Sequence, residues 1–193
     1  MAPINAQDFY RKKTQELIKG FEGYRDEAYL DGMGIPTIGY GATQHTDGTP
    51  VQMGDTITPQ AADELFDHHY QTTVESLNQN EAFRRLDPAT KGALTSFSYN
   101  VGPNFIGHKN FGTVTSAIES GDKEQIGNAM NMYVNPGTST EAGLRRRRTA
   151  EIDLMNTKFE RPNYSPNPYG RTDMSPNPYW VALSCDVTPI VLY

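Results

Sequence analysis

The sequence predicts an α+β fold that is mostly helical and contains one small β-hairpin. Two observations predict the helices: apolar side chains recur about every 3.6 residues, and Thr58-Pro59 and Asp87-Pro88 each place a capping residue before a proline. A third observation predicts the hairpin, because the turn sequence DGMG (31–34) separates two short strand-like pieces. With 193 residues, 36% of them hydrophobic, the chain can bury a sizeable core.

The N-terminal part is predicted to contain a helix, the hairpin and a long second helix. Asn5 or Asp8 can cap the first helix, which runs to about Gly20 with Phe9, Lys13, Leu17 and Phe21 on one face. The strand-like pieces are 28–30 and 35–39, and a loop at 43–50 follows them. The second helix begins after Thr58, and an apolar stripe marks about five turns of it: Ala62, Leu65, Phe66, His69, Thr73 and Leu77.

The C-terminal part is predicted to be a series of helices. One begins after Asp87 and ends before Gly102, a short one covers 111–119, and Asp122 caps another over 123–132. After a loop at 134–140, Ser139 or Thr140 is expected to cap the last helix. The expected core face of that helix is Leu144, Arg148, Glu151, and Leu154 or Met155.

Three polar residues lie where the predicted local structure changes. Glu22 follows the first helix, Asp31 opens the turn and Thr37 lies on the returning strand. A carboxyl half-buried among Phe21 and its neighbouring tyrosines would stay protonated, whereas one on a solvated turn would stay ionised. Two carboxyls in different protonation states, with a hydroxyl to hold a water, are what the hydrolysis of a glycosidic bond requires. Taken singly, each residue is more often a cap, a turn former or an ordinary strand residue.

Three sequence blocks carry a resemblance to a known family. In the first, eight residues separate Glu22 from Asp31 and five separate Asp31 from Thr37, which lies in GIPTIGYG (34–41). The second is ALTSFSYNVG (93–102), and the third, GLRRRRTAE (143–151), has the pattern G-L-x-x-R-R-x-A-E. In this order, the blocks closely resemble the bacteriophage-type lysozymes, glycoside hydrolase family 24.

This resemblance implies a two-lobed, lysozyme-like catalytic domain over residues 1–160. It consists of a small β lobe at about 20–57, a long connecting helix, and a helical lobe at about 80–160 that includes the N-terminal helix. A cleft between the lobes would hold the substrate. The Pro/Asn/Tyr-rich residues 161–193, which repeat SPNPY at 165–169 and 175–179, are not covered by the resemblance and are expected to pack on the domain.

The activity implied by the resemblance is that of a muramidase, which cleaves the β-1,4 bond between N-acetylmuramic acid and N-acetylglucosamine in peptidoglycan, with inversion. Glu22 would be the general acid, Asp31 the ionised partner and Thr37 the residue that positions the water. Tyr99 and Asn100 are candidates for substrate binding, although packing in the helical core is an equal alternative for Tyr99. One arginine of 145–148 is expected to pair with a carboxylate near Glu22 across the lobes. No cofactor or metal is implied.

Charge and composition restrict the partners. A net charge of −6 argues against nucleic-acid binding, and no apolar run is long enough for a membrane span. The single cysteine, Cys185, and the absence of a secretory leader pattern predict synthesis in the cytoplasm, with action in the periplasm or on the wall. Release would need a holin-type pore or a secretion apparatus. An inhibitor or immunity protein is a further possible partner, and a monomer is expected.

Phage-type host lysis is the function predicted first, and three alternatives stay open at this stage. The chain is also compatible with a wall-degrading toxin delivered between bacteria. A non-catalytic peptidoglycan-binding module is a second alternative, although the presence of all three candidate catalytic residues argues against it. A lytic transglycosylase or a chitinase is the third, and its products would distinguish it.

Overall fold

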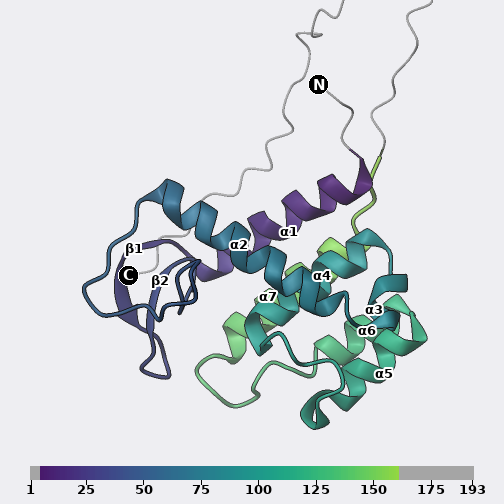
Figure 1. Ribbon diagram of the computed structural model, residues 1–193. Helices are drawn as coiled ribbons and strands as arrows, with labels where there is room; N and C mark the ends of the chain where they lie inside the picture. The colour runs from purple at the N-terminus through teal and green to yellow at the C-terminus, as the bar shows by residue number, and fades with distance from the viewer. Residues whose placement is uncertain (1–4, 161–193) are drawn as a thin grey trace, which may run out of the picture. The chain divides into compact units, whose positions relative to one another are not determined.

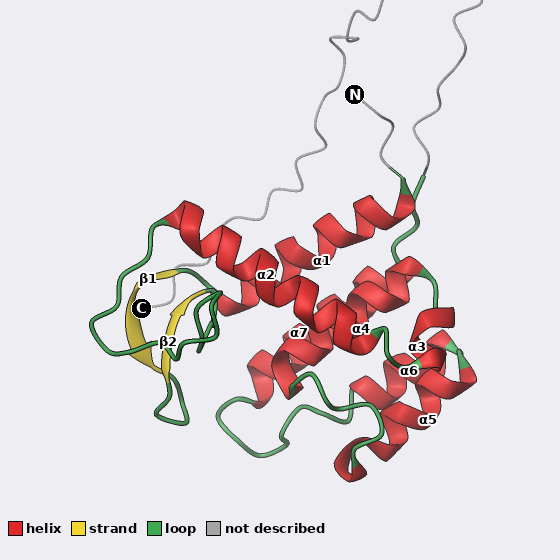
Figure 2. Ribbon diagram, viewed as in Figure 1, coloured by secondary structure: helices red, strands yellow, loops and turns green. Residues whose placement is uncertain are grey.

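Seven α-helices, one 3-10 turn and a two-stranded antiparallel sheet make up residues 5–160, the part of the chain that the computed structural model describes (Figure 1). The sheet and the helices form separate regions, as Figure 2 shows. In chain order the elements are α1 (Ala6–Glu22), β1 (Arg25–Leu30), β2 (Pro36–Gly39), α2 (Pro59–Leu77), α3 (Glu81–Arg85), α4 (Pro88–Val101), the 3-10 turn Lys109–Phe111, α5 (Gly112–Ser120), α6 (Lys123–Met130) and α7 (Glu141–Asn156).

The small lobe is a hairpin with a long loop folded against it. β1 pairs antiparallel with β2, with Tyr29 opposite Thr37 and Leu30 opposite Pro36. The loop returns beside β1, where the amide of Ala28 donates to the carbonyl of Asp55. A small apolar core of Ile38, Ala42, Val51 and Leu65 joins this lobe to α2.

The helical lobe is built around α4, which packs against α7 and against α1. The close approach to α1 depends on Gly92, because a Cβ atom at this position would lie 2.3 Å from the Oγ1 of Thr14. Phe97, Phe105 and Leu94 lie in the main apolar core, which α5 and α6 close. The long helix α2 connects the lobes (Figure 1). The predicted mostly helical α+β fold with a hairpin lobe is therefore confirmed.

Most of the predicted helix starts are confirmed by capping hydrogen bonds. The side chains of Asn5, Thr58, Asp87 and Asp122 each accept a hydrogen bond from a backbone N–H in the first turn of the helix that follows. Thr140 is different: it stands at the start of α7 without a capping bond.

Two predictions about packing need correction, and one short helix was missed. The buried face of α1 carries Tyr10, Thr14 and Ile18, one position beyond the predicted row, and Phe21 from that row is 39% exposed. On α2, Tyr70 is buried where the predicted stripe placed its neighbour His69. The short α3 was not predicted, because five residues are too few to show a helical period.

Asp87 ties the start of α4 to α6. Its carboxylate accepts hydrogen bonds from the amides of Ala89 and Thr90, from the hydroxyl of Thr90 and from the ammonium of Lys123. Burial by itself raises the pKa of Asp87, but the bonds from Thr90 and Lys123 hold this pKa below its ordinary value of 3.8.

Replacing Asp87 with alanine is expected to lower the free energy of unfolding by about 1–2 kcal/mol at neutral pH. The pKa of Asp87 is lower in the folded state than its ordinary value of 3.8. The stabilisation that the charged carboxylate provides is therefore fully present above pH 3.8, and it is lost as the pH falls through the folded-state pKa. The difference between wild type and variant, measured by urea unfolding, should therefore shrink on acidification. A difference that does not change with pH would contradict this account.

The predictions on residues 161–193 concern a part of the chain outside the described residues. Among residues 5–160, no helix is long and apolar enough to cross a membrane.

Candidate active site

Glu22 is the last residue of α1. The helix ends there because Gly23 adopts a φ of 69°, in the region that favours glycine, and returns its amide to the carbonyl of Lys19. The Glu22 side chain is 25% exposed, and its Oε1 accepts a hydrogen bond of 2.8 Å from Nη1 of Arg147. A helix end and an arginine from α7, 125 residues later, thus meet at one carboxyl group.

The surroundings of Glu22 differ from the apolar pocket that the sequence predicted. Its nearest charged neighbour is a guanidinium, and both Phe21 and Tyr24 are more than one third exposed. On the other side of the carboxyl group is Gly41, where a Cβ atom would lie 3.4 Å from Oε2 of Glu22. Gly41 also has a φ of 86°, so a side chain there would be both strained and in contact with the carboxyl group.

Asp31 and Thr37 are joined through one residue of the hairpin, Ile35. Asp31 Oδ1 accepts hydrogen bonds of 2.8 Å from the amides of Met33 and Ile35. The carbonyl of Ile35 accepts from the amide of Asp31 and, at 3.0 Å, from the hydroxyl of Thr37. The turn therefore fixes the carboxylate and the hydroxyl relative to each other.

Arg147 is held by acceptors on three helices. Nη1 donates to Glu22 on α1, Nη2 donates to the carbonyl of Ser96 on α4 at 3.2 Å, and Nε donates to Glu151 on α7 at 3.3 Å. Its guanidinium carbon also lies 5.5 Å from the centre of the Phe21 ring. The predicted pair between the arginine run and a carboxylate near Glu22 is therefore confirmed: the carboxylate is Glu22 itself, and the arginine is Arg147.

A buried cluster of charges supports this arginine. Oε1 of Glu151 accepts from the Ser96 hydroxyl at 2.8 Å and from Nη2 of Arg148 at 3.2 Å, and its Oε2 lies 3.0 Å from Nε of Arg148. Arg148 and Glu151 are both fully buried. Burial raises the pKa of Glu151, and the charges of Arg148 and Arg147 oppose this change. Burial lowers the pKa of Arg148 to about 10, which leaves it charged at neutral pH.

Comparison with known proteins gives the family. The phage lysozyme family model matches residues 19–151, a span that contains all three candidate catalytic residues. The chain belongs to the phage lysozyme family. Its function is accordingly that of a lysozyme, a glycoside hydrolase that degrades bacterial peptidoglycan.

Three relatives illustrate the match. The endolysin of Salmonella phage P22 is 31% identical over 140 residues, which are 68% of this chain and 87% of that protein. The structure of an endolysin from Escherichia coli O157:H7 phage FAHEc1 is 32% identical, covers 75% of this chain and 90% of its own, and has a TM-score of 0.63. The structure of the muramidase domain of SpmX from Asticaccaulis excentricus is 30% identical, covers 75% of this chain and 95% of its own, and has a TM-score of 0.62.

The two predicted substrate-binding residues of the lysozyme have different surroundings. Tyr99 packs on Phe66, with ring centres 5.8 Å apart, and its hydroxyl is buried without a hydrogen-bond partner among the described residues. Burial raises the pKa of this hydroxyl. The Oδ1 of Asn100 accepts a hydrogen bond of 2.8 Å from Arg148. Substrate binding by Tyr99 and Asn100 stays a prediction.

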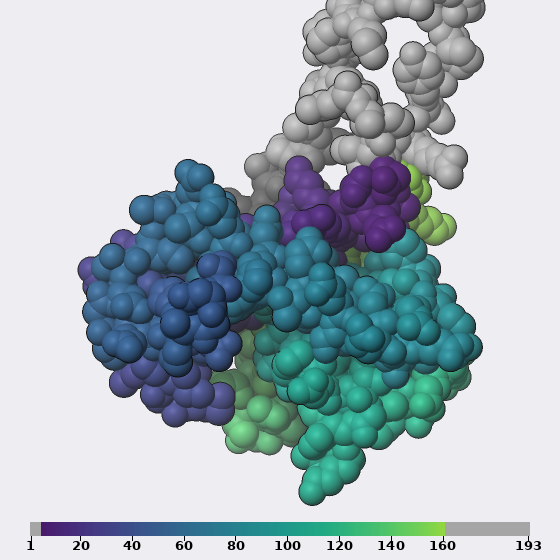
Figure 3. All heavy atoms as spheres, viewed as in Figure 1, coloured from purple at the N-terminus to yellow at the C-terminus, as the bar shows by residue number. Residues whose placement is uncertain are grey.

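A polar groove of about 690 Å³ lies between the small lobe and α2 of the lysozyme. Its walls are the loop 43–48, one face of α2 from His68 to Ser76, and Pro103. The loop begins two residues after Gly41, the glycine beside the Glu22 carboxyl group. Figure 3 shows the small lobe and the helical lobe separated by a hollow on the face in view.

The histidines near the groove do not form a metal site. Nε2 of His45 lies 3.0 Å from Oδ2 of Asp55. Burial, and to a smaller extent the charge of the neighbouring His68, lowers the pKa of His69. Within residues 5–160 there is no cluster of three histidine, cysteine, aspartate or glutamate side chains that could hold an ion.

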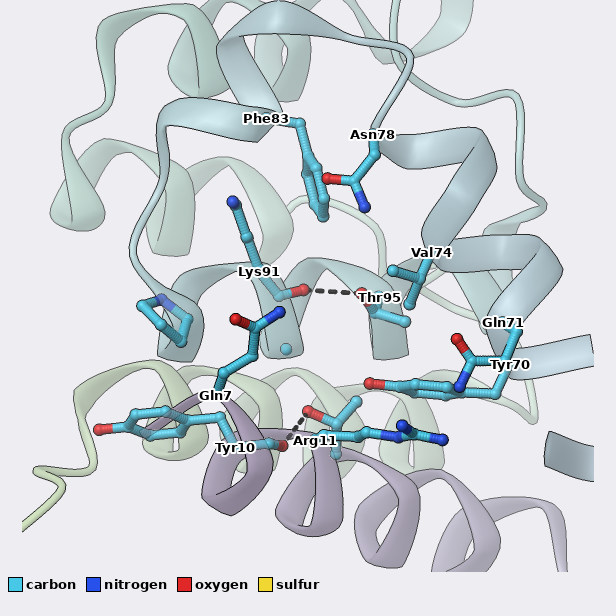
Figure 4. Close-up of a pocket in the computed structure, with 13 residues that line it drawn as sticks. Gln7, Tyr10, Arg11, Tyr70, Gln71, Val74, Asn78, Phe83, Lys91 and Thr95 are labelled. Carbon is cyan, nitrogen blue, oxygen red and sulfur yellow. Dashed lines mark hydrogen bonds between the residues drawn. The ribbon is translucent and has the colours of Figure 1, made fainter. Parts of the chain in front are cut away.

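A second cavity, of about 210 Å³, lies between α1, α2 and α4 (Figure 4). Tyr10, Tyr70 and Phe83 line it, with Arg11 and Lys91 among the polar residues. Glu22, Asp31 and Thr37 line neither this cavity nor the polar groove.

Proposed function

We propose that this lysozyme hydrolyses the β-1,4 bond between N-acetylmuramic acid and N-acetylglucosamine, with Glu22 as the general acid. Glu22 donates a proton to the leaving glycosidic oxygen, and the ionised Asp31 assists the attack of a water on the sugar. The exposed quarter of the Glu22 side chain gives the substrate a route to the carboxyl group.

The observation that carries the proposal is the connection of Asp31 to Thr37 through Ile35. The Thr37 hydroxyl donates to the Ile35 carbonyl, so its oxygen has lone pairs that can accept a hydrogen bond from a water, and the residue is itself only 3% exposed. Asp31 uses Oδ1 for two backbone amides, and Oδ2 is not engaged by any described residue. A water between Thr37 and Oδ2 of Asp31 would donate one hydrogen to each oxygen, with its lone pair directed at the sugar.

The polar groove suits the remaining sugar units of a glycan strand. Thr43, Thr46, Thr72, Thr73 and Ser76 contribute hydroxyl groups, and Gln44 contributes an amide. Side chains of this type exchange hydrogen bonds with sugar hydroxyls and N-acetyl groups. The chain carries a net charge of −6, so these local contacts, rather than overall attraction to an anionic wall, would provide the affinity.

Inversion at the anomeric carbon is the stereochemical part of the proposal. An inverting enzyme holds its two carboxyl groups roughly 6.5–9.5 Å apart to leave room for the water, whereas a retaining enzyme holds them at about 5 Å. A water held between Thr37 and Asp31 requires the first arrangement. Proton NMR of a soluble glycan substrate shows which anomer forms first, and the α anomer is the expected result.

Mass spectrometry of the muropeptides released from purified peptidoglycan tests the reaction itself. Hydrolysis adds one water and leaves reducing N-acetylmuramic acid ends. Anhydro ends would instead identify a lytic transglycosylase, and reducing N-acetylglucosamine ends would identify cleavage of the other glycosidic bond. Cleavage of chitin oligomers at a comparable rate would indicate a chitinase.

Asp31→Asn is expected to reduce kcat on peptidoglycan by at least about 10²-fold, because the amide neither accepts a proton nor stabilises positive charge on the sugar. Asn keeps the Oδ1 acceptor for both backbone amides, so the turn and the melting temperature should be preserved. Asp122→Asn, a cap replacement in the helical lobe, is the matched control and should retain full activity. Full activity of Asp31→Asn would remove Asp31 from the mechanism.

A further inference from the structure

Arg147 links the buried charges of the helical lobe to Glu22. Arg147 and Arg148 carry two positive charges, and Glu151 lies between them. On the outer side of Arg147 is the carboxyl group of Glu22, at 2.8 Å. The candidate acid is therefore the outermost member of a chain of contacts that begins in the core of the helical lobe.

The direction in which Arg147 points depends on its inner acceptors. A guanidinium is a rigid plane, so fixing two of its nitrogens fixes the third. Nε is fixed by Glu151 Oε1, and Nη2 is fixed by the Ser96 carbonyl. The remaining nitrogen, Nη1, is then directed at Glu22.

Glu151 is itself held rigidly for this role. The Ser96 hydroxyl donates to the same oxygen that receives Arg147, and Arg148 holds the carboxylate from the opposite side. Arg148 is in turn held by Asn100 and by the ring of Phe97, whose centre lies 4.5 Å from the guanidinium carbon. Ser96, Arg148 and Glu151 are fully buried and cannot touch a glycan directly.

We propose that Glu151 is a positioning residue, which acts on the reaction by orienting Arg147 and thereby the carboxyl group of Glu22. The required feature is the hydrogen-bond acceptor at Oε1. The negative charge of Glu151 serves mainly to balance Arg148. This inference rests on the proposed role of Glu22 as the acid.

Two double variants separate the acceptor from the charge. In Arg148→Leu with Glu151→Gln, the acceptor is kept, whereas in Arg148→Leu with Glu151→Leu it is lost. Both variants remove one positive charge and one negative charge, so the net charge of the cluster is the same in each as in wild type. They differ only in whether residue 151 can accept the hydrogen bond from Nε of Arg147.

The variant with glutamine is expected to keep kcat within about threefold of wild type, and the variant with leucine to lose at least about tenfold, since small displacements of a catalytic group cost that much or more. KM should be unchanged in both, because neither residue touches the substrate. Glu141→Gln is the matched control: it is on the same helix, pairs with the exposed Arg145, and should leave kcat unchanged.

Equal kcat values for the two folded double variants would overturn the inference. If the leucine variant does not fold by circular dichroism, Ser96→Ala decides the question: it removes one hydrogen bond to Oε1, and a kcat lowered by about threefold at unchanged KM supports the proposal. Wild-type kcat in Ser96→Ala would then reject it. A fully active Glu22→Gln variant would instead contradict the proposed role of Glu22 as the acid. Failure of this inference and failure of the proposed function therefore give different results.

Discussion

Replacing Glu22 with glutamine is expected to lower kcat on peptidoglycan by about 10⁴-fold, the upper end of what a positioned general acid contributes. The leaving sugar oxygen departs poorly as an alkoxide. The other acid that pairs with Arg147 is Glu151, which is fully buried and cannot reach the substrate to replace Glu22 as a donor. Glutamine is isosteric and keeps an oxygen for the hydrogen bond from Nη1. The variant should therefore fold, bind glycan with an unchanged KM, and fail in the chemical step.

Initial rates of muropeptide release, measured by mass spectrometry, provide the readout for this variant. Glu16→Gln is a suitable control, since it lies on the same helix and makes only exposed pairs with Lys12 and Lys13. It should behave as wild type. Near-normal rates in folded Glu22→Gln would show that another group donates the proton, and would leave Asp31 and Thr37 without their proposed partner.

Local signals allowed much of this fold to be predicted. A capping side chain acts on amides two or three residues away, so Thr58 and Asp87 could be recognised without any tertiary information. The hairpin could also be predicted from local sequence, because the turn at Asp31 sets the pairing of the strands beside it. The position of Glu22 at a helix end followed in the same way, from Gly23.

The parts that could not be predicted depend on contacts between distant segments. Nothing local distinguishes Arg147 from Arg146, and the choice follows from the orientation of α7 against α4 and α1. The same packing turns Arg147 and Arg148 inward, toward Ser96 and Glu151, and leaves Arg145 and Arg146 exposed. For this reason the sequence predicted that one arginine of the run pairs near Glu22, but not which one. Periodicity alone showed Arg148 and Glu151 on the core face, but not their connection to Glu22 through Arg147.

Glu151→Leu as a single substitution is expected to lower the free energy of unfolding by about 3–5 kcal/mol, the usual cost of leaving a buried charge without its partner. Arg148 is fully buried, and without Glu151 the guanidinium keeps only Asn100 and the Phe97 ring. Urea unfolding with comparison of m-values measures the change and shows whether the unfolded state is altered. Glu81→Gln, which breaks the exposed pair with Arg85, should cost less than about 0.5 kcal/mol.

Adding Arg148→Leu to Glu151→Leu is expected to restore much of this loss, since an apolar pair of similar volume avoids the cost of burying two ions. Arg147 and Glu22 then remain in contact at the edge of the site. A double variant that is less stable than Glu151→Leu alone would mean that Arg148 stabilises the core through its contacts with Asn100 and Phe97. If stability returns while kcat stays low, the cluster has two separable roles: charge balance in the core, and orientation of Arg147 toward the acid.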